Sequence, residues 1–214
     1  MRIDYEFTNN ADDGTVDEHE LEVELETPLN RRFLVELEAE KKWELSGPGV
    51  DTHESEWAIL FDFQLIDTYN TAVLFDLKVT PAPQTGDRSE IRVLLAGFHD
   101  LGRRIGLQWH IGDEFFLGDA APGATDNRLT YALAPTITVT EDVPYLEHLT
   151  LFLETFGRTN LDGVDAGRTR LSLLPGAKWE LGREIYVGVG YELPVVGPRP
   201  YDGILHFQFV KEFD

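Results

Sequence analysis

Strict alternation of apolar and polar residues is the feature that most constrains this chain. At 185–195 every odd-numbered residue is apolar or aromatic, while Tyr, Gly, Glu and Pro stand between. A loop rich in Pro and Gly follows at 196–203, and the next stretch alternates again, with Phe207 and Phe209 on one face and His206 on the other. Successive side chains of a strand point to opposite faces, so this pattern predicts strands with two unlike faces.

The same period of two recurs along the whole chain and indicates about twelve strands and no helix, on which apolar residues would circle the axis. The connections after odd-numbered strands are longer and rich in Gly, Pro or Asp, including one at 46–55, while the others are mostly short. This is typical of transmembrane barrels with short periplasmic turns and longer outer loops. We therefore predict an all-β fold over residues 1–214: a single antiparallel up-and-down transmembrane β-barrel with both termini periplasmic.

Alternation alone does not decide between lipid and a soluble core, because β-sandwiches alternate too. The apolar faces end repeatedly in aromatic residues, as an interfacial girdle requires, and the opposite faces carry Glu, Gly, Ser, Thr, His and Gln, which suit a wet interior. A lysine at mid-bilayer costs about 2–4 kcal/mol, so Lys41 and Lys211, which fall on the apolar face, are expected near a membrane boundary. The predicted girdle consists of Trp43, Trp57, Trp109, Trp179, Tyr191 and Phe213.

Composition excludes several classes of function. The net charge of −21 makes nucleic acid an improbable partner, because phosphate binding requires a basic surface. The chain has no cysteine, so disulfides, thiol catalysis and Cys-type zinc sites are excluded. No apolar run is long enough for a transmembrane helix. No signal peptide is visible after Met1, so an exported protein would here be a mature chain with an added initiator methionine.

The last part of the chain resembles a known family. The run at 190–194, the Pro-rich segment at 197–202 and a final alternating strand closing on Phe213 are similar to bacterial outer-membrane β-barrels of the phenol-degradation meta-pathway type, which are transporters and porin-like proteins. The Pro-Gly-Ala-Lys-Trp-Glu-Leu stretch at 175–181 resembles the penultimate hairpin of that family. The resemblance implies a monomeric channel. It also implies that a terminal aromatic residue is the signal recognised by the barrel-assembly machinery, although here Asp214 follows Phe213.

The candidate functional residues are carboxylates on two neighbouring predicted strands. Antiparallel pairing would place the glutamates of one strand on the same inward face as the glutamates of the neighbouring strand. Three interpretations stay open: a cation-attracting lumen wall, a weak divalent-ion site, or a solvated face that only avoids lipid. Arg170, Lys178 and His206 are also predicted inside, either as a counter-charge that shapes the field or as partners for nearby acids. The glutamates are Glu20, Glu22, Glu24, Glu26, Glu36, Glu38 and Glu40.

No histidine pair has a metal-ligand spacing, and neither a nucleophile motif nor a phosphate loop occurs. We therefore expect no metal, no cofactor and no enzymatic activity. The leading hypothesis is an outer-membrane channel that passes small polar or cationic solutes through an acidic lumen. Its partners would be outer-membrane lipid, small solutes and, during biogenesis, the barrel-assembly machinery. The alternatives are a soluble barrel or sandwich that binds a small apolar ligand, with Trp57, Phe61 and Phe207 in its core, and a structural or engineered scaffold without native transport.

Overall fold

The computed structural model describes residues 1–10, 16–46, 49–84, 87–102, 104–119, 122–139, 148–182, 184–199 and 201–212. In these residues twelve strands form one closed antiparallel barrel, and the described residues contain no helix that could span a membrane. The strands are β1 (Arg2–Asn10), β2 (Val16–Asn30), β3 (Phe33–Ser46), β4 (Gly49–Thr68), β5 (Thr71–Thr80), β6 (Ser89–Gly102), β7 (Ile105–Leu117), β8 (Asn127–Thr138), β9 (Leu149–Asn160), β10 (Thr169–Gly182), β11 (Ile185–Val196) and β12 (Gly203–Lys211).

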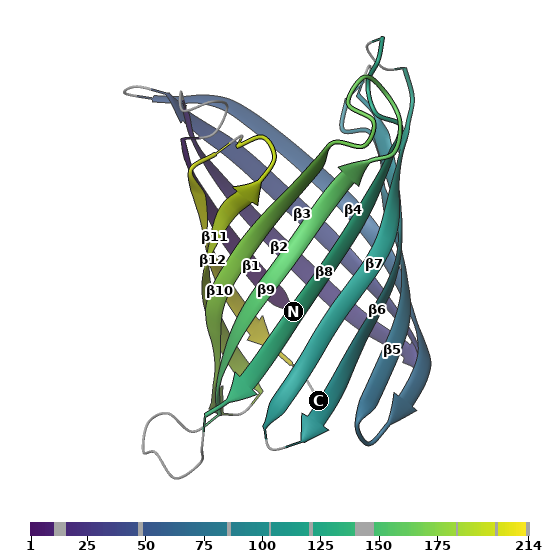
Figure 1. The fold of residues 1–214 in the computed structure, drawn as a ribbon, viewed down its shortest axis with the longest axis vertical. Coiled ribbons are helices and arrows are strands. Elements are labelled where there is room, and N and C mark those ends of the chain that lie inside the picture. Colours follow the sequence, from purple (N-terminus) through teal and green to yellow (C-terminus); the bar gives the residue numbers. More distant parts are fainter. Residues whose placement is uncertain are drawn as a thin grey trace.

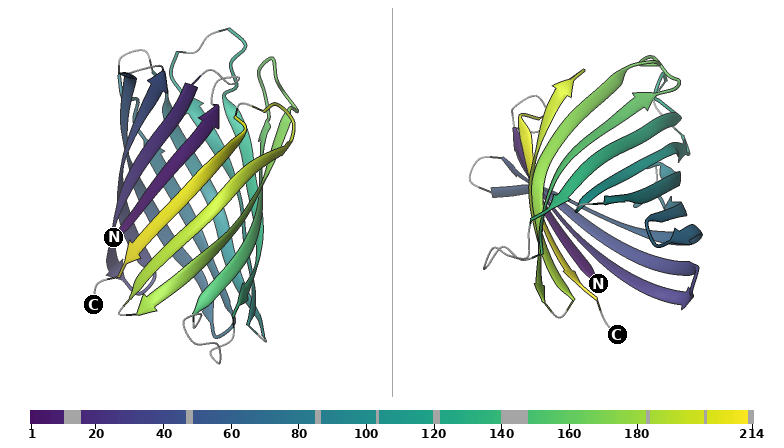
Figure 2. Two further views of the ribbon diagram at one scale, coloured as in Figure 1. Left: turned by 90° about the vertical axis from the view of Figure 1, so that its left-hand side faces the viewer. Right: turned by 60° about the horizontal axis from the view of Figure 1, so that its bottom comes forward.

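Each strand pairs with its neighbours in sequence, and β1 closes the barrel against β12. The closing ladder runs from Arg2 opposite Val210 to Asn9 opposite Gly203, and the amino group of Met1 donates to the carbonyl of Lys211 at 3.0 Å. The strands are tilted around the axis, and both termini lie at the same end of the barrel (Figures 1 and 2). The predicted all-β, up-and-down barrel of twelve strands is confirmed; which end faces the periplasm stays a prediction.

The two ends of the barrel differ in their connections. At the end with the termini, called the turn end here, two residues separate β2 from β3, β4 from β5, β6 from β7 and β10 from β11, whereas ten separate β8 from β9. The opposite, loop end carries the connections at 81–88, 118–126, 161–168 and 197–202.

The loop predicted at 46–55 was wrong, because β4 begins at Gly49 and its ladder with β3 continues to Ser46 opposite Gly49. Strand pairing needs only backbone groups, and beyond a bilayer both faces of a strand are wet. Hydropathy therefore no longer marks where the strand ends.

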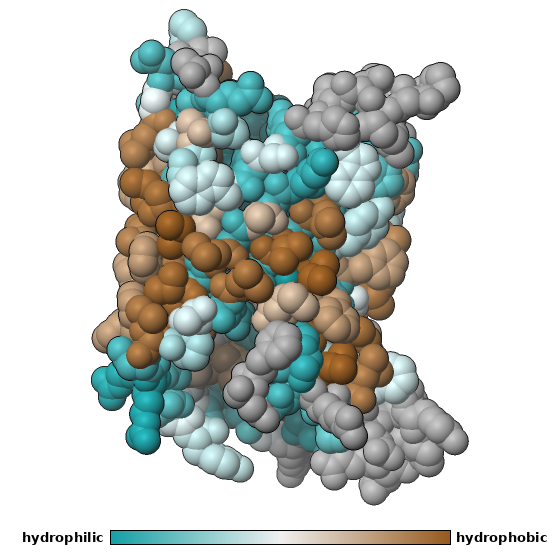
Figure 3. Space-filling model, turned by 180° about the vertical axis from the view of Figure 1, so that it is seen from behind, coloured by the Kyte–Doolittle hydropathy of each residue, from teal (hydrophilic) through white to brown (hydrophobic). Residues whose placement is uncertain are grey.

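The apolar faces point outward. Large side chains such as Leu37 and Leu133 are 51% and 50% exposed, and on the face shown in Figure 3 an apolar belt crosses the middle of the barrel between more hydrophilic ends. Trp57 and Phe207 are exposed on this belt, which is the reverse of what the soluble alternative expects. Among the described residues the buried set is mostly polar: Thr8, Glu24, Glu38, Asp76, Glu114, Thr130, Ser172 and Glu192, with Ala58, Leu60 and Ala134 as its apolar members.

The predicted girdle residues occupy both ends of the outer face. Near the loop end Trp43 stacks on the ring of His19, with centroids 5.5 Å apart, and Tyr191 is exposed on β11. Near the turn end Trp109 stacks on His99 at 6.4 Å. Trp179, near the end of β10, lies in register with Leu149 and Val187, while Trp57 is farther from a strand end on the long β4; Phe213 lies outside the described residues.

The two outward lysines lie where the apolar belt gives way to polar surface. Lys41 is exposed and stands in register with Leu21 on one side and Ser55 on the other, within the last part of β3. Lys211 ends β12, and its Nζ is 3.6 Å from a carboxylate oxygen of Glu184 in the neighbouring turn. Both positions agree with the expected membrane boundary, whose depth stays a prediction.

Replacing Leu133, at the middle of β8, by Arg should destabilise the barrel in a bilayer by about 2–4 kcal/mol, because the guanidinium would enter the hydrocarbon at mid-depth. The control is Leu29→Arg, close to the turn end, where the cost should be about 1 kcal/mol or less. Urea titration of the barrel folded into phospholipid vesicles, followed by tryptophan fluorescence, measures both. Equal small effects would mean that the belt does not contact lipid.

Candidate functional site in the lumen

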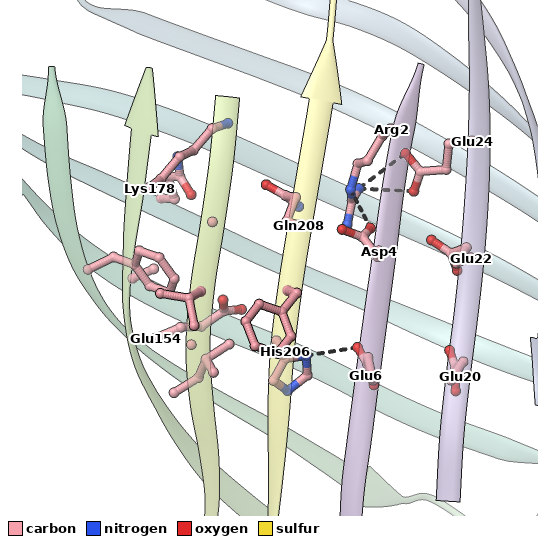
Figure 4. Close-up of a pocket in the computed structure, with 18 of the residues that line it drawn as sticks. Arg2, Asp4, Glu6, Glu20, Glu22, Glu24, Glu154, Lys178, His206 and Gln208 are labelled. Carbon is pink, nitrogen blue, oxygen red and sulfur yellow. Dashed lines mark hydrogen bonds and ion pairs between the residues drawn. The ribbon is translucent and has the colours of Figure 1, made fainter. Parts of the chain in front are cut away.

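The register of β1, β2 and β3 gathers carboxylates on the inward face. Asp4 pairs with Glu22, and Glu22 with Glu40, so three acids lie side by side across the three strands. All seven predicted glutamates share this alternation, and Figure 4 shows Glu20, Glu22 and Glu24 of β2 beside Asp4 and Glu6 of β1. We call this surface the acidic wall: Asp4, Glu6, Glu20, Glu22, Glu24, Glu26, Glu36, Glu38 and Glu40.

Basic side chains that the sequence reasoning did not assign to this wall neutralise part of it. The guanidinium of Arg2 contacts Asp4 at 2.5 Å and Glu24 at 2.9 Å. The Lys42 ammonium lies 3.2 Å from Glu20 and 2.8 Å from Glu40, and Lys78 pairs with Glu38 from β5. The signal was available, because the even-numbered residues of each strand face inward, and these three cations have even numbers.

Three of the predicted glutamates have no basic partner among the described residues. In the part of the chain that the structure describes, Glu22, Glu26 and Glu36 have no basic group within ion-pair distance. Like charges this close repel each other unless water or mobile cations screen them. The acidic wall is therefore a mixture of internal ion pairs and unpaired carboxylates.

His206 faces the lumen, as predicted, and connects β12 with both neighbouring strands. Its Nδ1 lies 2.8 Å from Glu6 on β1 (Figure 4), and its Nε2 lies 3.2 Å from Glu192 on β11. The hydroxyl of Tyr201, from the connection before β12, donates to Glu192 and lies 3.3 Å from the hydroxyl of Ser172. This polar network surrounds the buried carboxylate of Glu192 with partners.

Basic residues on the far side of the barrel were only partly predicted. Arg92, Arg128 and Arg158 line a cavity of about 970 Å³ toward the loop end, and the sequence reasoning named none of them. The predicted Arg170 lines a small recess of about 80 Å³ with Arg128 and Arg158. The predicted Lys178 lies toward the turn end, with its ammonium 4.9 Å from the centre of the Tyr186 ring. The lumen therefore carries more basic side chains than the predicted Arg170 and Lys178, and they are distributed over more of its length.

Two cavities follow one another along the lumen. The cavity of about 970 Å³ toward the loop end and one of about 600 Å³ below it share lining residues, including Arg2, Glu6 and Leu174. Their lining is mainly polar and charged. The described residues therefore enclose a polar, charged interior behind an apolar exterior, which is the reverse of a soluble protein.

Groups of carboxylates approach closely enough to hold an ion, but nothing else points to one. Asp4, Glu22 and Glu24 each offer an oxygen within 4.8 Å of the others, and two further groups within the acidic wall do the same. Arg2 already occupies two of these three carboxylates. The absence of a metal site stays a prediction.

Three connections at the loop end are held together by hydrogen bonds. Asp162 accepts from the backbone N–H of Asp126 at 2.7 Å and of Asn127 at 3.1 Å. These N–H donors, the Asp126 bond first, hold the pKa of the Asp162 carboxyl below its ordinary value. Arg88 donates to the carbonyl of Phe116 at 2.6 Å and to that of Thr125 at 2.8 Å. The described residues of connections 81–88, 118–126 and 161–168 are therefore linked along one edge of the mouth.

Comparison with known proteins relates this barrel to porins by fold. The NanC porin structure superposes with a TM-score of 0.66 over 99% of both chains at 8% identity. The KdgM porin, alone and in complex with disordered oligogalacturonate, gives TM-scores of 0.65 and 0.64 over 100% of both chains at 10% identity. No protein-family model matches the sequence, and no curated protein matches it significantly. The chain thus has the twelve-stranded fold of these porins, while the phenol-degradation type receives no support.

Removing the Lys78 ammonium should leave Glu38, whose side chain is only 7% exposed, as an uncompensated charge among other carboxylates. We expect Lys78→Met to lower the free energy of unfolding by about 3 kcal/mol. Lys211→Met, which breaks a more exposed pair with Glu184, should cost about 1 kcal/mol or less. Urea unfolding in vesicles compares the two, and equal losses would contradict a structural role for the Lys78 pair.

Asp162→Ala should loosen the mouth, because the N–H groups of Asp126 and Asn127 lose their acceptor. Hydrogen exchange at these two amides should become faster, with the strands unaffected; Asp165→Ala in the same connection is the control. In the parent protein the lowered pKa means that this protection is complete above the ordinary value of 3.8 and is lost as the pH falls below it. Loss of protection on raising the pH instead would contradict this assignment.

Proposed function

We propose that this protein is a porin-like channel of the bacterial outer membrane through which small polar or cationic solutes cross passively. The observation that carries the proposal is a charged, hollow lumen enclosed by an exposed apolar belt. An outward apolar belt is stable only in lipid, and a wet lumen gives solutes a polar path through it. The shared fold of the NanC and KdgM porins supports this proposal.

The preference for cations follows from the unpaired carboxylates of the acidic wall. Glu22 and Glu36 have no basic partner among the described residues, whereas Arg2, Lys42 and Lys78 are engaged with acids. A narrow passage with low-dielectric walls concentrates counter-ions near such charges. Selection would therefore depend on lumen width and on the acidic wall, with no energy source in this chain.

A second candidate is passage of anionic oligosaccharides. Arg92, Arg128 and Arg158 line the cavity toward the loop end, and the KdgM porin was crystallised with oligogalacturonate. Two of these arginines have acidic partners, since Arg128 lies 3.2 Å from Glu114 and Arg92 lies 3.8 Å from Asp76. The acidic wall therefore outweighs them, and we favour cations.

The further expectations belong to the same proposal. We infer a monomer with periplasmic termini, assembled by the barrel-assembly machinery and without enzymatic activity or nucleic-acid binding. Membership in the phenol-degradation type also stays a prediction. The girdle and lumen residues named from the sequence would contact lipid and solute respectively.

Reversal potentials across planar bilayers in a KCl gradient test the proposal. The parent protein should prefer potassium over chloride, and Glu22→Gln combined with Glu36→Gln should lower the permeability ratio roughly twofold or more, because two unpaired lumen charges are removed. The control pair, Asp67→Asn with Asp119→Asn, removes two charges outside the lumen cavities and should leave the ratio unchanged.

The outcomes separate the alternatives. A chloride-selective parent channel would contradict the cation preference and favour the arginine-lined anion path. A folded barrel that inserts but carries no current would favour a scaffold without transport.

A further inference from the structure

The lumen has two unlike walls. In a closed barrel of twelve strands, β1–β3 lie across the lumen from β7–β9. The first group carries the acidic wall. The facing side, extended to β6 and β10, carries apolar side chains between Arg92, Arg128 and Arg158 in the lumen cavities. We call these apolar side chains the apolar wall: Leu94, Ala96, Ala134, Phe152, Phe156 and Leu174.

The larger side chains of the apolar wall lie flat over glycines on the next strand. A Cβ added at Gly112 would stand 2.7 Å from Cδ1 of Leu94, and one at Gly190 would stand 2.8 Å from Cδ1 of Leu174. Phe152 covers Gly176 in the same way. Contacts this short are not found for real side chains, so these glycines are recesses that the neighbouring side chains fill. The apolar surface is therefore smooth and leaves the lumen open.

One lumen cavity is lined by both the apolar wall and the acidic wall. The cavity of about 600 Å³ is lined by Glu22, Glu24 and Glu38 on one side and by Ala134, Phe152 and Leu174 on the other. A solute in it meets carboxylates and apolar carbon at once. An inorganic cation would use only the first surface, and a neutral apolar molecule only the second.

We propose that the lumen is selective for amphipathic organic cations, which carry an ammonium group and a flat apolar face such as an aromatic ring. This inference rests on the proposed channel function and names its solute class. The ammonium group is attracted by the unpaired carboxylates of the acidic wall. The ring is removed from water when it packs against the apolar wall. Both contacts form in one cavity, so the two contributions act on the same molecule.

The test compares three probes as blockers of the potassium current in planar bilayers. Phenyltrimethylammonium has both features, tetramethylammonium has the charge without the ring, and benzenesulfonate has the ring with the opposite charge. The first should bind about tenfold more tightly than the second, which corresponds to about 1.4 kcal/mol, and benzenesulfonate should not block. Leu94→Ser combined with Leu174→Ser should abolish the difference between the two cations. Ile204→Ser, which changes an apolar lumen residue on β12, should preserve it.

Heat-modifiable gel mobility verifies that each variant is folded. Equal affinity for the two cations in a potassium-selective channel would overturn this inference and leave the proposed function intact, as would equal block by benzenesulfonate. If the barrel carries no current, saturation-transfer NMR on the barrel folded in detergent makes the same comparison. A ring-dependent preference there would support the solute class while the channel function failed, and no preference would overturn it.

Discussion

Satisfaction of backbone hydrogen bonds is the constraint on which the rest of this structure depends. An apolar belt around twelve strands can be covered only by lipid, and lipid offers no partner for an N–H or C=O group. The ladder between β1 and β12 removes the two edges that an open sheet would leave. Once the barrel is closed, successive side chains of each strand alternate between the lipid side and the lumen side. Whether a charged strand residue faces lipid or lumen therefore follows from whether its residue number is odd or even.

That dependence explains how much could be predicted from sequence. Strand number and antiparallel order follow from alternation, and both were predicted correctly. The same alternation places the predicted glutamates of β2 and β3 in register on one face. The start of β4 could not be predicted, because outside a bilayer a strand need not alternate. Phe213 falls outside the described residues, so the proposed assembly signal is not tested.

The site was harder to predict than the fold, because it depends on which strands meet across the barrel. Arg2 and Lys42 are even-numbered residues on β1 and β3, so their inward orientation was readable, yet their ion pairs depend on cross-strand register. The facing of β1–β3 by β7–β9 depends on the closed topology and on no local pattern. A sequence therefore reveals the chemistry of each wall before it reveals which walls share a cavity.

The glycines beneath the apolar wall allow the width of the lumen to change without a change in the strand pairing that stabilises the barrel. Gly176 and Gly190 pair with each other across β10 and β11, and a side chain at either would first meet the side chain of Phe152 or Leu174 and not the backbone. Any larger residue at one of them would lift the leucine or phenylalanine that now covers it toward the axis. The lumen can thus be narrowed by one substitution at a time while the strands around it stay in register. A barrel of fixed strand number can therefore accommodate solutes of different width.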